Sequence, residues 1–418
     1  MHSAAPDVLP FPARTRRRPK SGAARRLPGL DAPGRILYGV QGEGRGHAAR
    51  SLQVIQWLRN RGHRVKVLTG GDALQVLAGH GLDVCEVPLL RYRFRPDGSL
   101  DPWRTLGENA ARALGLFLGL GPRYARVAGI VREFRPDLVI SDFEPYLSRL
   151  APRLKVPLLA IDHQHFLTES VLPALAGWQK SLALKLYQLG TRLLAGRPDR
   201  IITSSFWHFP RKRASQALFV GPFIPGNLKR LRGAPGDGSV TVYLKQPAYL
   251  RVLLPVLAAR PETRFRVFAP WPANPRPQTP AHIELHRIDR DAFLAQLARG
   301  SALLTTAGNQ VIGEAVYLHK PVLAFPETEV LEQELNAAAL SMSGFGMTFR
   351  LHEFNAGIWD GFARGLPEFR ARMEAGAASR PSYDGRREAL RAVRRFISEI
   401  AVAARRRDKS RGRLSFAP

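Results

Sequence analysis

The stretch 302–337 restricts the fold of this chain more than any other part of the sequence. Short apolar runs at 302–305 and 321–325 are typical of buried parallel strands, and each is followed by a turn and a helix-forming segment. Consecutive strand–helix units predict a parallel α/β sheet. The turn Thr306–Asn309 leads directly into a helix, and the free N–H groups and dipole at a helix start favour an anionic ligand.

A second series of the same kind begins near the N-terminus. Residues 35–40 are predicted to form a strand, 41–47 a Gly-rich loop, 48–61 a helix and 63–69 a further strand. The loop lacks G-x-G-x-x-G spacing and the second strand ends without an acidic residue, which argues against a nicotinamide or flavin dinucleotide site. We therefore predict an α/β protein with two Rossmann-like domains.

The domain boundaries are predicted from changes in composition along the chain. The Gly/Pro/Arg-rich segment that ends at Gly238 separates the two series, and both chain ends are basic and lack hydrophobic periodicity. We expect a disordered basic arm at 1–34, an N-terminal Rossmann-like domain at 35–205, a linker at 206–238, a C-terminal Rossmann-like domain at 239–380, a C-terminal helix at 381–404 and a basic tail at 405–418.

Charge and cysteine content narrow the partners and the compartment. The formal net charge of +29 suits nucleic acid, an anionic membrane or phosphorylated small molecules. No nucleic-acid-binding motif is present, so no specific nucleic-acid partner is expected. Cys85 is the single cysteine, which excludes a disulfide framework and fits a reducing cytosol. No apolar run is long enough to span a membrane, but residues 171–197 form an amphipathic pattern that suits either core packing or a basic surface resting on an anionic bilayer.

Polar residues follow several of the predicted strands. His47 follows the first strand, Asp142 ends the strand 136–142, and His163 and His165 follow the strand beginning at Pro157. Because open α/β sheets bind ligands at the carboxyl ends of their strands, we expect these side chains at one edge. Their spacing matches no standard metal motif.

A second acidic pattern, Asp289-Arg290-Asp291, has two interpretations. It resembles the D-x-D of metal-dependent sugar transferases, which would place a metal ion there. It also stands at the start of a predicted helix, where Asp is the expected N-cap.

The stretch 302–337 also resembles the donor-binding signature of glycosyltransferase family 28. That group includes the peptidoglycan-precursor N-acetylglucosamine transferase and the galactolipid synthases, with the UDP-glucuronosyltransferases as more distant relatives. The matching features are a small-residue turn, a helix with Glu314, then Pro321, Glu332-Gln333 and Asn336-Ala337. The loop GEGRGHAARS resembles the family's Gly-rich acceptor loop with its His. The resemblance implies a GT-B architecture, in which two Rossmann-like domains face each other across a cleft. It also implies that the N-terminal domain, 35–205, binds the acceptor and that the C-terminal domain, 239–380, binds the donor.

The resemblance also implies a reaction and a set of site residues. It suggests an inverting, metal-independent hexosyltransferase without a cofactor that uses a nucleotide diphosphate sugar, most often UDP-linked. Glu314 would bind the ribose, Glu332 and Gln333 the sugar, and His47 would be the general base oriented by Asp142. The donor-binding set would be Thr306, Gly308, Asn309, Gln310, Glu314, Glu332, Gln333 and Asn336, and the acceptor side Gly44, Gly46, His163 and His165.

The acceptor is less constrained than the donor. The resemblance, the basic surface and the amphipathic stretch suggest a lipid, lipid-linked or cell-envelope glycan acceptor, used by a cytoplasmic protein that is peripheral on the inner face of the cytoplasmic membrane. Two alternatives keep the same fold: a nucleotide-sugar 2-epimerase, which needs no acceptor, and a non-catalytic nucleotide-sugar-binding protein.

Overall fold

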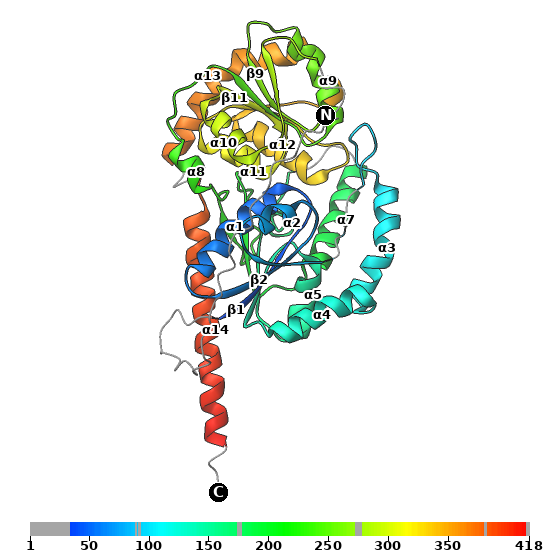
Figure 1. Ribbon diagram of the computed structural model, residues 1–418, viewed down its shortest axis with the longest axis vertical. Coiled ribbons are helices and arrows are strands. Elements are labelled where there is room, and N and C mark those ends of the chain that lie inside the picture. The colour runs from blue at the N-terminus through cyan, green and yellow to red at the C-terminus, as the bar shows by residue number, and fades with distance from the viewer. Residues whose placement is uncertain are drawn as a thin grey trace, which may run out of the picture.

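The computed structural model describes residues 34–414, except 88, 89, 91, 92, 174–177, 272–277 and 380–382. Two α/β units lie one above the other, and the chain passes between them more than once (Figure 1). The basic arm predicted for residues 1–34, apart from Gly34, lies outside the described residues, as do the last four residues of the predicted tail.

The N-terminal unit is a seven-stranded parallel sheet in the order β3-β2-β1-β4-β5-β6-β7. Its strands are β1 (Arg35–Val40), β2 (Arg64–Thr69), β3 (Asp83–Glu86), β4 (Leu138–Asp142), β5 (Leu158–Asp162), β6 (Arg200–Ser204) and β7 (Leu218–Val220). Its helices are α1 (Arg45–Arg59), α2 (Gly71–Ala78), α3 (Pro102–Leu118), α4 (Pro122–Phe134), α5 (Pro145–Arg153), α6 (Phe166–Glu169) and α7 (Trp178–Ala195). The strand order reverses between β1 and β4, and open sheets bind ligands at this kind of switch point.

The C-terminal unit repeats the plan with six parallel strands in the order β10-β9-β8-β11-β12-β13. Its strands are β8 (Val240–Tyr243), β9 (Phe265–Phe268), β10 (Ile283–His286), β11 (Ala302–Thr306), β12 (Val322–Phe325) and β13 (Gly346–Thr348). Its helices are α8 (Gly226–Arg230), α9 (Pro247–Ala258), α10 (Arg290–Arg299), α11 (Asn309–Tyr317), α12 (Leu331–Ser343) and α13 (Ala356–Ser379), with a short 3-10 turn at Leu351–Glu353. The predicted fold class, two Rossmann-like α/β units, is confirmed.

The C-terminal helix returns to the N-terminal unit. Helix α14 (Arg386–Leu414) runs down beside the first sheet (Figure 1), and its Ala389, Val393 and Phe396 share a hydrophobic core with β1 and β2. Two boundaries therefore differ from the sequence prediction. Helix α14 continues past residue 404 into the predicted tail. Residues 218–220 of the predicted linker form the strand β7, which pairs with β6 at the edge of the first sheet.

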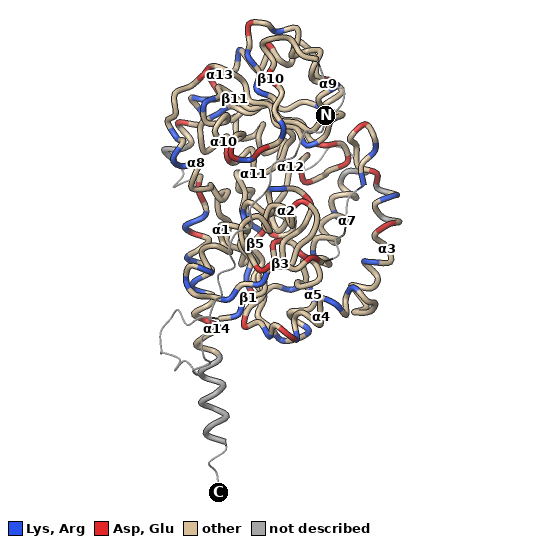
Figure 2. The backbone as a smooth tube through the Cα atoms, viewed as in Figure 1, with Lys and Arg blue, Asp and Glu red and all other residues tan. Residues whose placement is uncertain are grey.

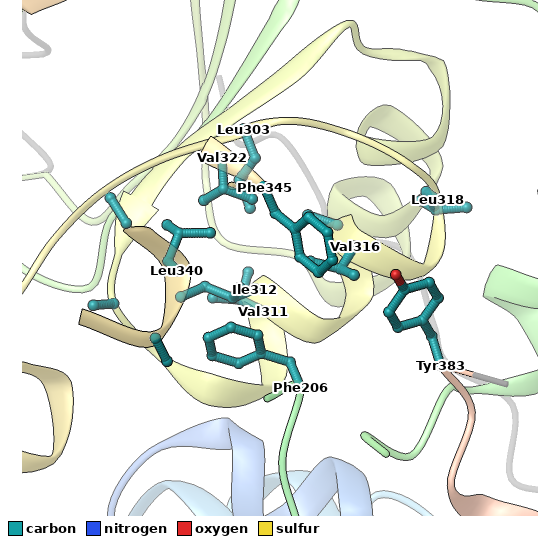
Figure 3. Close-up of a cluster of buried hydrophobic side chains, with 14 of the residues drawn as sticks. Phe206, Leu303, Val311, Ile312, Val316, Leu318, Val322, Leu340, Phe345 and Tyr383 are labelled. Atoms are coloured by element: carbon teal, nitrogen blue, oxygen red, sulfur yellow. The ribbon is translucent and has the colours of Figure 1, made fainter. Parts of the chain in front are cut away.

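The two units meet along helix α11. Phe206 packs beneath Val311 and Ile312 in a hydrophobic cluster shared by both units (Figure 3). Gly313 allows this approach, because a Cβ there would lie 2.5 Å from Pro222 Cγ. These contacts hold the start of α11 against the carboxyl edge of the first sheet.

Candidate functional site

A cleft of about 460 Å³ lies between the carboxyl ends of the two sheets. Its volume is within the range of small-molecule sites. From the N-terminal unit it is lined by Gly44, Gly46, His47, Arg50, Asp72, His163 and Gln164, and from the C-terminal unit by Lys245, Arg290, Gly308, Asn309, Gln310, Glu327, Glu332 and Gln333.

His47, on the N-terminal wall of the cleft, contacts the buried Asp142. Asp142 ends β4 and His47 lies in the first turn of α1, next to the neighbouring strand β1. His47 Nδ1 is 2.7 Å from Asp142 Oδ1, which favours the tautomer whose Nδ1–H donates to the carboxylate. The other ring nitrogen, Nε2, is 3.4 Å from the side-chain nitrogen of Gln164 in the cleft wall. The arrangement leaves Nε2 as a proton acceptor on the cleft side.

Asp142 is fully buried and has two further partners. Arg50 binds both carboxylate oxygens, with Nη2 2.6 Å from Oδ1 and Nε 3.0 Å from Oδ2, and the Ser51 hydroxyl donates to Oδ2 at 2.9 Å. Burial acts to raise the pKa of Asp142, but the charges of Arg50 and His47 outweigh it and hold the pKa below its usual value. The carboxylate is therefore ionised and rigidly oriented.

On the opposite wall, helix α11 points its N-terminal end into the cleft. Gly308 is its N-cap, and Gly308, Asn309 and Gln310 line the cavity. Asn309 links the units: its Oδ1 accepts from the Phe206 amide at 3.0 Å and its Nδ2 donates to the Ser204 carbonyl at 3.1 Å. Thr306, the fourth residue predicted here, is fully buried at the end of β11 and is not among the lining residues.

Glu314 does not reach the cleft as the ribose-binding prediction requires. Its carboxylate is fully buried and binds Arg290 with both oxygens, including a 3.0 Å contact from Nη1 to Oε2. Gln310 Nε2 donates to the same carboxylate at 2.7 Å. Arg290, about a third exposed, is the member of the pair that lines the cleft. Glu314 pairs with Arg290, and does not face the cleft, because a buried carboxylate needs a charged partner.

The loop before α12 and the first turn of that helix supply the remaining polar wall. Glu332 faces Gln164 at 3.3 Å and His163 at 3.7 Å across the cleft. Gln333 is bound to Glu327, whose amide donates to Gln333 Oε1 at 3.0 Å and whose carboxylate accepts from Gln333 Nε2. Both lie on the cavity wall.

Asn336 and His163 tie the two units together behind this wall. Asn336 is buried outside the cavity lining, donates to the Ala307 carbonyl at 3.0 Å and faces His163 Nε2 at 3.1 Å. Burial lowers the pKa of His163 despite the nearby Glu332, so its ring is neutral. This contact positions the start of α12 against the N-terminal unit.

Lys245 adds a cation at the end of β8. The residue lines the cleft together with the acidic side chains of Asp72, Glu327 and Glu332. Desolvation acts to lower the pKa of Lys245, but Glu327, Tyr243, Glu332 and Asp72 outweigh it, so the pKa is raised and the charge is retained. The C-terminal wall of the cleft thus carries two cations, Lys245 and Arg290, together with the N-terminal end of α11, while Arg45 and Arg50 line the N-terminal wall.

The remaining acceptor-side residues divide between the cleft and the protein interior. Gly44, with φ of 80°, caps α1, and Gly46 lies so close to α11 that a Cβ there would be 3.5 Å from Gln310 Cβ. His165 is not in the cleft: it is buried, and its Nδ1 contacts Asp162 Oδ2 at 2.7 Å. Helix α6 begins immediately after it and turns the ring inward.

The Asp289-Arg290-Asp291 pattern functions as a helix start in this structure. Asp289 is the N-cap of α10 and accepts from the Ala292 amide at 2.8 Å, and Asp291 binds Asn227. Within the part of the chain that the structure describes, no group of three or more His, Cys, Asp or Glu side chains could hold a metal ion.

The cleft residues that the predicted site lacked include Arg50, Lys245, Arg290 and Glu327. Arg50 could have been found from its helical spacing after His47, since residues three apart share a helix face. Lys245 could have been found from its place at the carboxyl end of β8. Glu327 could have been found in the same way, from its place just after β12, whereas Arg290 carried no comparable local signal.

Two parallel sheets whose carboxyl ends face one cleft define a GT-B glycosyltransferase fold. The chain belongs to glycosyl transferase family 1, whose family model matches residues 34–367. It is therefore a glycosyltransferase. The match is to family 1 and does not confirm the narrower resemblance to family 28, and it gives the 2-epimerase alternative no support.

Similar proteins agree with this assignment. An uncharacterized glycosyltransferase of Methanosarcina acetivorans is 24% identical over 333 residues, which cover 75% of this chain and 84% of that protein. Among solved structures, the glycosyltransferase of kitacinnamycin has a TM-score of 0.64 at 17% identity and covers 87% of this chain and 99% of its own. The glycosyltransferase VinC in complex with dTDP has a TM-score of 0.55 at 16% identity, covering 87% and 100%. At these identities the structures show a shared fold.

Proposed function

We propose that this glycosyltransferase moves a sugar from a nucleotide diphosphate sugar, with UDP as the nucleotide, to a hydroxyl group of a lipid, lipid-linked or cell-envelope acceptor. The observation that carries the proposal is the position of His47, which is bonded to Asp142 through Nδ1 while it lines the cleft opposite the start of α11. A base and an anion-binding helix end on facing walls suit a displacement between an acceptor hydroxyl and a sugar diphosphate.

In this reaction His47 is the general base. Its Nε2 takes the proton of the acceptor hydroxyl as the oxygen forms a bond to the anomeric carbon. The bond from that carbon to the diphosphate oxygen breaks, and the diphosphate leaves with the electron pair. A single displacement inverts the anomeric centre. Asp142 holds the ring and stabilises the imidazolium, as buried carboxylates do for catalytic histidines.

The donor side can stabilise the leaving diphosphate without a metal ion, because it presents fixed positive charge. The N-terminal end of α11, the Arg290 guanidinium and the Lys245 ammonium all line the cleft. VinC, which shares the fold, was solved with dTDP, a nucleoside diphosphate. The acidic and amide side chains Glu327, Glu332 and Gln333 are suited to sugar hydroxyls.

A surface beside the cleft supports a lipid acceptor. We call it the leucine surface: Leu114, Leu118, Leu120, Leu182, Leu186, Leu189 and Leu193, all exposed, from α3 with the turn after it and from α7. Arg149 links the two helices, since its guanidinium lies 5.1 Å from the Phe117 ring and contacts the Leu193 carbonyl. Exposed apolar side chains in such number are typical of contact with a partner or membrane.

The same surface is basic and adjoins the cleft. Lys185 and Arg192 lie among its leucines along α7, and Lys and Arg residues recur along α3 and α4 (Figure 2). Tyr187 of α7 lines the cleft. In the described parts of the chain, no helix is both long and apolar enough to cross a membrane. The combination of leucines and cations suits peripheral contact with an anionic bilayer, at the inner face of the cytoplasmic membrane.

Thermal stabilisation by nucleotide sugars tests the donor. UDP-glucose, UDP-galactose, UDP-N-acetylglucosamine, GDP-mannose and dTDP-glucose form a suitable panel. A ligand present at 100 times its Kd adds about 2.7 kcal/mol to the free energy of unfolding, and we expect the largest shift from a UDP-sugar. A shift from none of the panel would reject the donor site. Acceptor-dependent release of UDP by the wild type, lost in His47→Asn, separates an enzyme from a non-catalytic binder.

A further inference from the structure

A hairpin of the N-terminal unit reaches across to the C-terminal unit. We call residues 93–101 the strap: Phe94 and Leu100 form an antiparallel bridge, and the Arg95 amide donates to the Ser99 carbonyl at 2.8 Å. The strap precedes α3 and extends toward α9 (Figure 1). Phe94 lines the cleft, so the strap is both a link between the units and part of the cavity wall.

The tip of the strap is fitted to its contact surface. The Leu100 amide donates to the Thr328 carbonyl at 3.2 Å, and the Tyr249 hydroxyl lies 2.9 Å from the Gly98 carbonyl oxygen. Gly98 has φ of 85°, and a Cβ there would lie 2.4 Å from the Tyr249 ring. Only glycine therefore allows this docked arrangement without displacement of the ring.

The hydroxyl of Tyr249 has two acceptors and one hydrogen. Besides the Gly98 carbonyl, it lies 3.1 Å from Glu327 Oε1, and both acceptors are buried. Burial and the Glu327 charge raise the pKa of Tyr249, so the hydroxyl keeps its proton. A tyrosine O–H can make one full-strength donation, so Gly98 and Glu327 compete for it.

Glu327, one of the two acceptors that compete for the Tyr249 hydrogen, also lines the cleft. Its Oε2 accepts from Gln333, whereas Oε1 has Tyr249 as its hydrogen-bond partner, and the residue lines the cavity. A ligand hydroxyl that donates to Oε1 satisfies this oxygen and leaves the tyrosine hydrogen for Gly98. Occupation of the cleft at Glu327 then strengthens strap docking, and strap docking strengthens ligand binding by the same factor.

We propose that Tyr249 is a positioning residue that couples binding of the donor's sugar at Glu327 to docking of the strap, an inference that rests on the proposed glycosyltransferase function. The coupling distinguishes a complete nucleotide sugar from the nucleoside diphosphate that remains after transfer. Only the complete donor presents sugar hydroxyls to Glu327, so product release would be accompanied by loosening of the strap.

Hydrogen exchange of the full-length protein tests the coupling. The probes are the most stabilising nucleotide sugar of the panel above and its matching nucleoside diphosphate. In the wild type, we expect the nucleotide sugar to slow exchange of the strap peptide 93–101 at least threefold more than the diphosphate does. In Tyr249→Phe this difference should disappear, and the Kd of the diphosphate should stay within twofold of the wild type. The KM for the nucleotide sugar should stay at or below the wild-type value, because no protein hydroxyl then competes with the ligand for Glu327 Oε1.

Two further variants complete the test. Tyr124→Phe removes a hydroxyl that accepts from Arg153 away from the cleft, and it should behave as wild type. Gly98→Ala blocks docking while keeping the Tyr249 hydroxyl, and it should abolish the exchange difference. A wild-type exchange difference in Tyr249→Phe, or equal weakening of diphosphate and nucleotide sugar, overturns the coupling. Absence of stabilisation of the wild type by any nucleotide sugar rejects the proposed function itself.

Discussion

The guanidinium of Arg290 and the carboxylate of Glu314 form a two-pronged ion pair at the edge of the cleft, with Arg290 Nη1 3.0 Å from Glu314 Oε2. Gln310 supplies a third donor to the same carboxylate. Glu314 is fully buried, whereas Arg290 is about a third exposed, so at the proposed donor site a nucleotide would contact Arg290. The proposed role of Glu314 is then to orient Arg290.

This relationship predicts insensitivity to the ribose 2′-hydroxyl. If Glu314 does not bind the ribose, UDP and 2′-deoxy-UDP should have Kd values within about threefold of each other. A direct hydrogen bond from that hydroxyl to a carboxylate would instead be worth about 1.5–3 kcal/mol, or more than tenfold in affinity. Calorimetric titration with both nucleotides measures the ratio. A tenfold ratio of the two Kd values that disappears in Glu314→Gln would show that Glu314 binds the ribose directly.

Arg290→Lys keeps the positive charge of the guanidinium but not its planar fork. We expect it to weaken UDP binding by about tenfold, because a lysine cannot bind Glu314 and a diphosphate with the same fixed geometry. Arg287→Lys is the matched control: Arg287 lies three residues earlier, packs on Trp271 and is not among the cleft residues. Equal losses in both variants would remove Arg290 from the donor site.

The partners of Asp142 predict that its loss and the loss of His47 differ in kind. His47→Ala should lower kcat by about 10²–10⁴-fold, the usual contribution of a general base, while the protein stays folded. Asp142→Asn also leaves the buried Arg50 without its counter-charge, which costs about 3–5 kcal/mol of stability.

Denaturant unfolding and steady-state rates separate these two effects. Arg50→Met combined with Asp142→Asn removes both charges and should recover part of the stability without recovering kcat. Wild-type activity in His47→Ala would reject the assigned base. Stability of Asp142→Asn equal to that of the wild type would show that Arg50 does not need its partner.

The contact between His47 and Asp142 could be predicted from the sequence, because β1 and β4 were expected to end at the same sheet edge. Strand-end positions are set by local patterns that a sequence displays. The position of His165 could not be predicted in this way. It lies two residues after the cleft-lining His163, and α6 turns its ring toward Asp162.

Long-range pairing limited the rest of the prediction. Arg290 stands between two aspartates whose pattern suggested either a metal site or a cap, and its own role depends on Glu314, 24 residues away in sequence. The return of α14 to the first sheet likewise depends on Phe396 meeting a core formed by residues far earlier in the chain. Such contacts are decided by tertiary packing, for which a single sequence carries no periodic signal.

The leucine surface predicts binding to anionic vesicles. The double variant Leu186→Ser with Leu189→Ser should bind vesicles of phosphatidylglycerol and phosphatidylcholine at least tenfold more weakly than the wild type. Each leucine is about half exposed, so removing it costs about 1 kcal/mol of the free energy of transfer into the bilayer. Met342→Ser changes an exposed apolar side chain of α12, outside this surface, and should have no effect. Co-sedimentation at two salt concentrations measures binding, and equal binding of all three proteins would exclude the surface.

Glu144 predicts how stability changes with pH. It caps α5, its carboxylate accepts from the Tyr146 and Leu147 amides, and burial raises its pKa to about 7. Between pH 4.5 and about 7 the folded state then holds a proton that the unfolded state has released. The free energy of unfolding should therefore fall as pH rises through this window, by up to about 3 kcal/mol from this group.

Glu144→Gln keeps one acceptor for the helix amides and cannot ionise. The difference in unfolding free energy between wild type and variant, measured in urea at pH 5 and pH 8, isolates this group from the histidines that titrate in the same range. A difference that stays constant between the two pH values would show that Glu144 is ionised throughout.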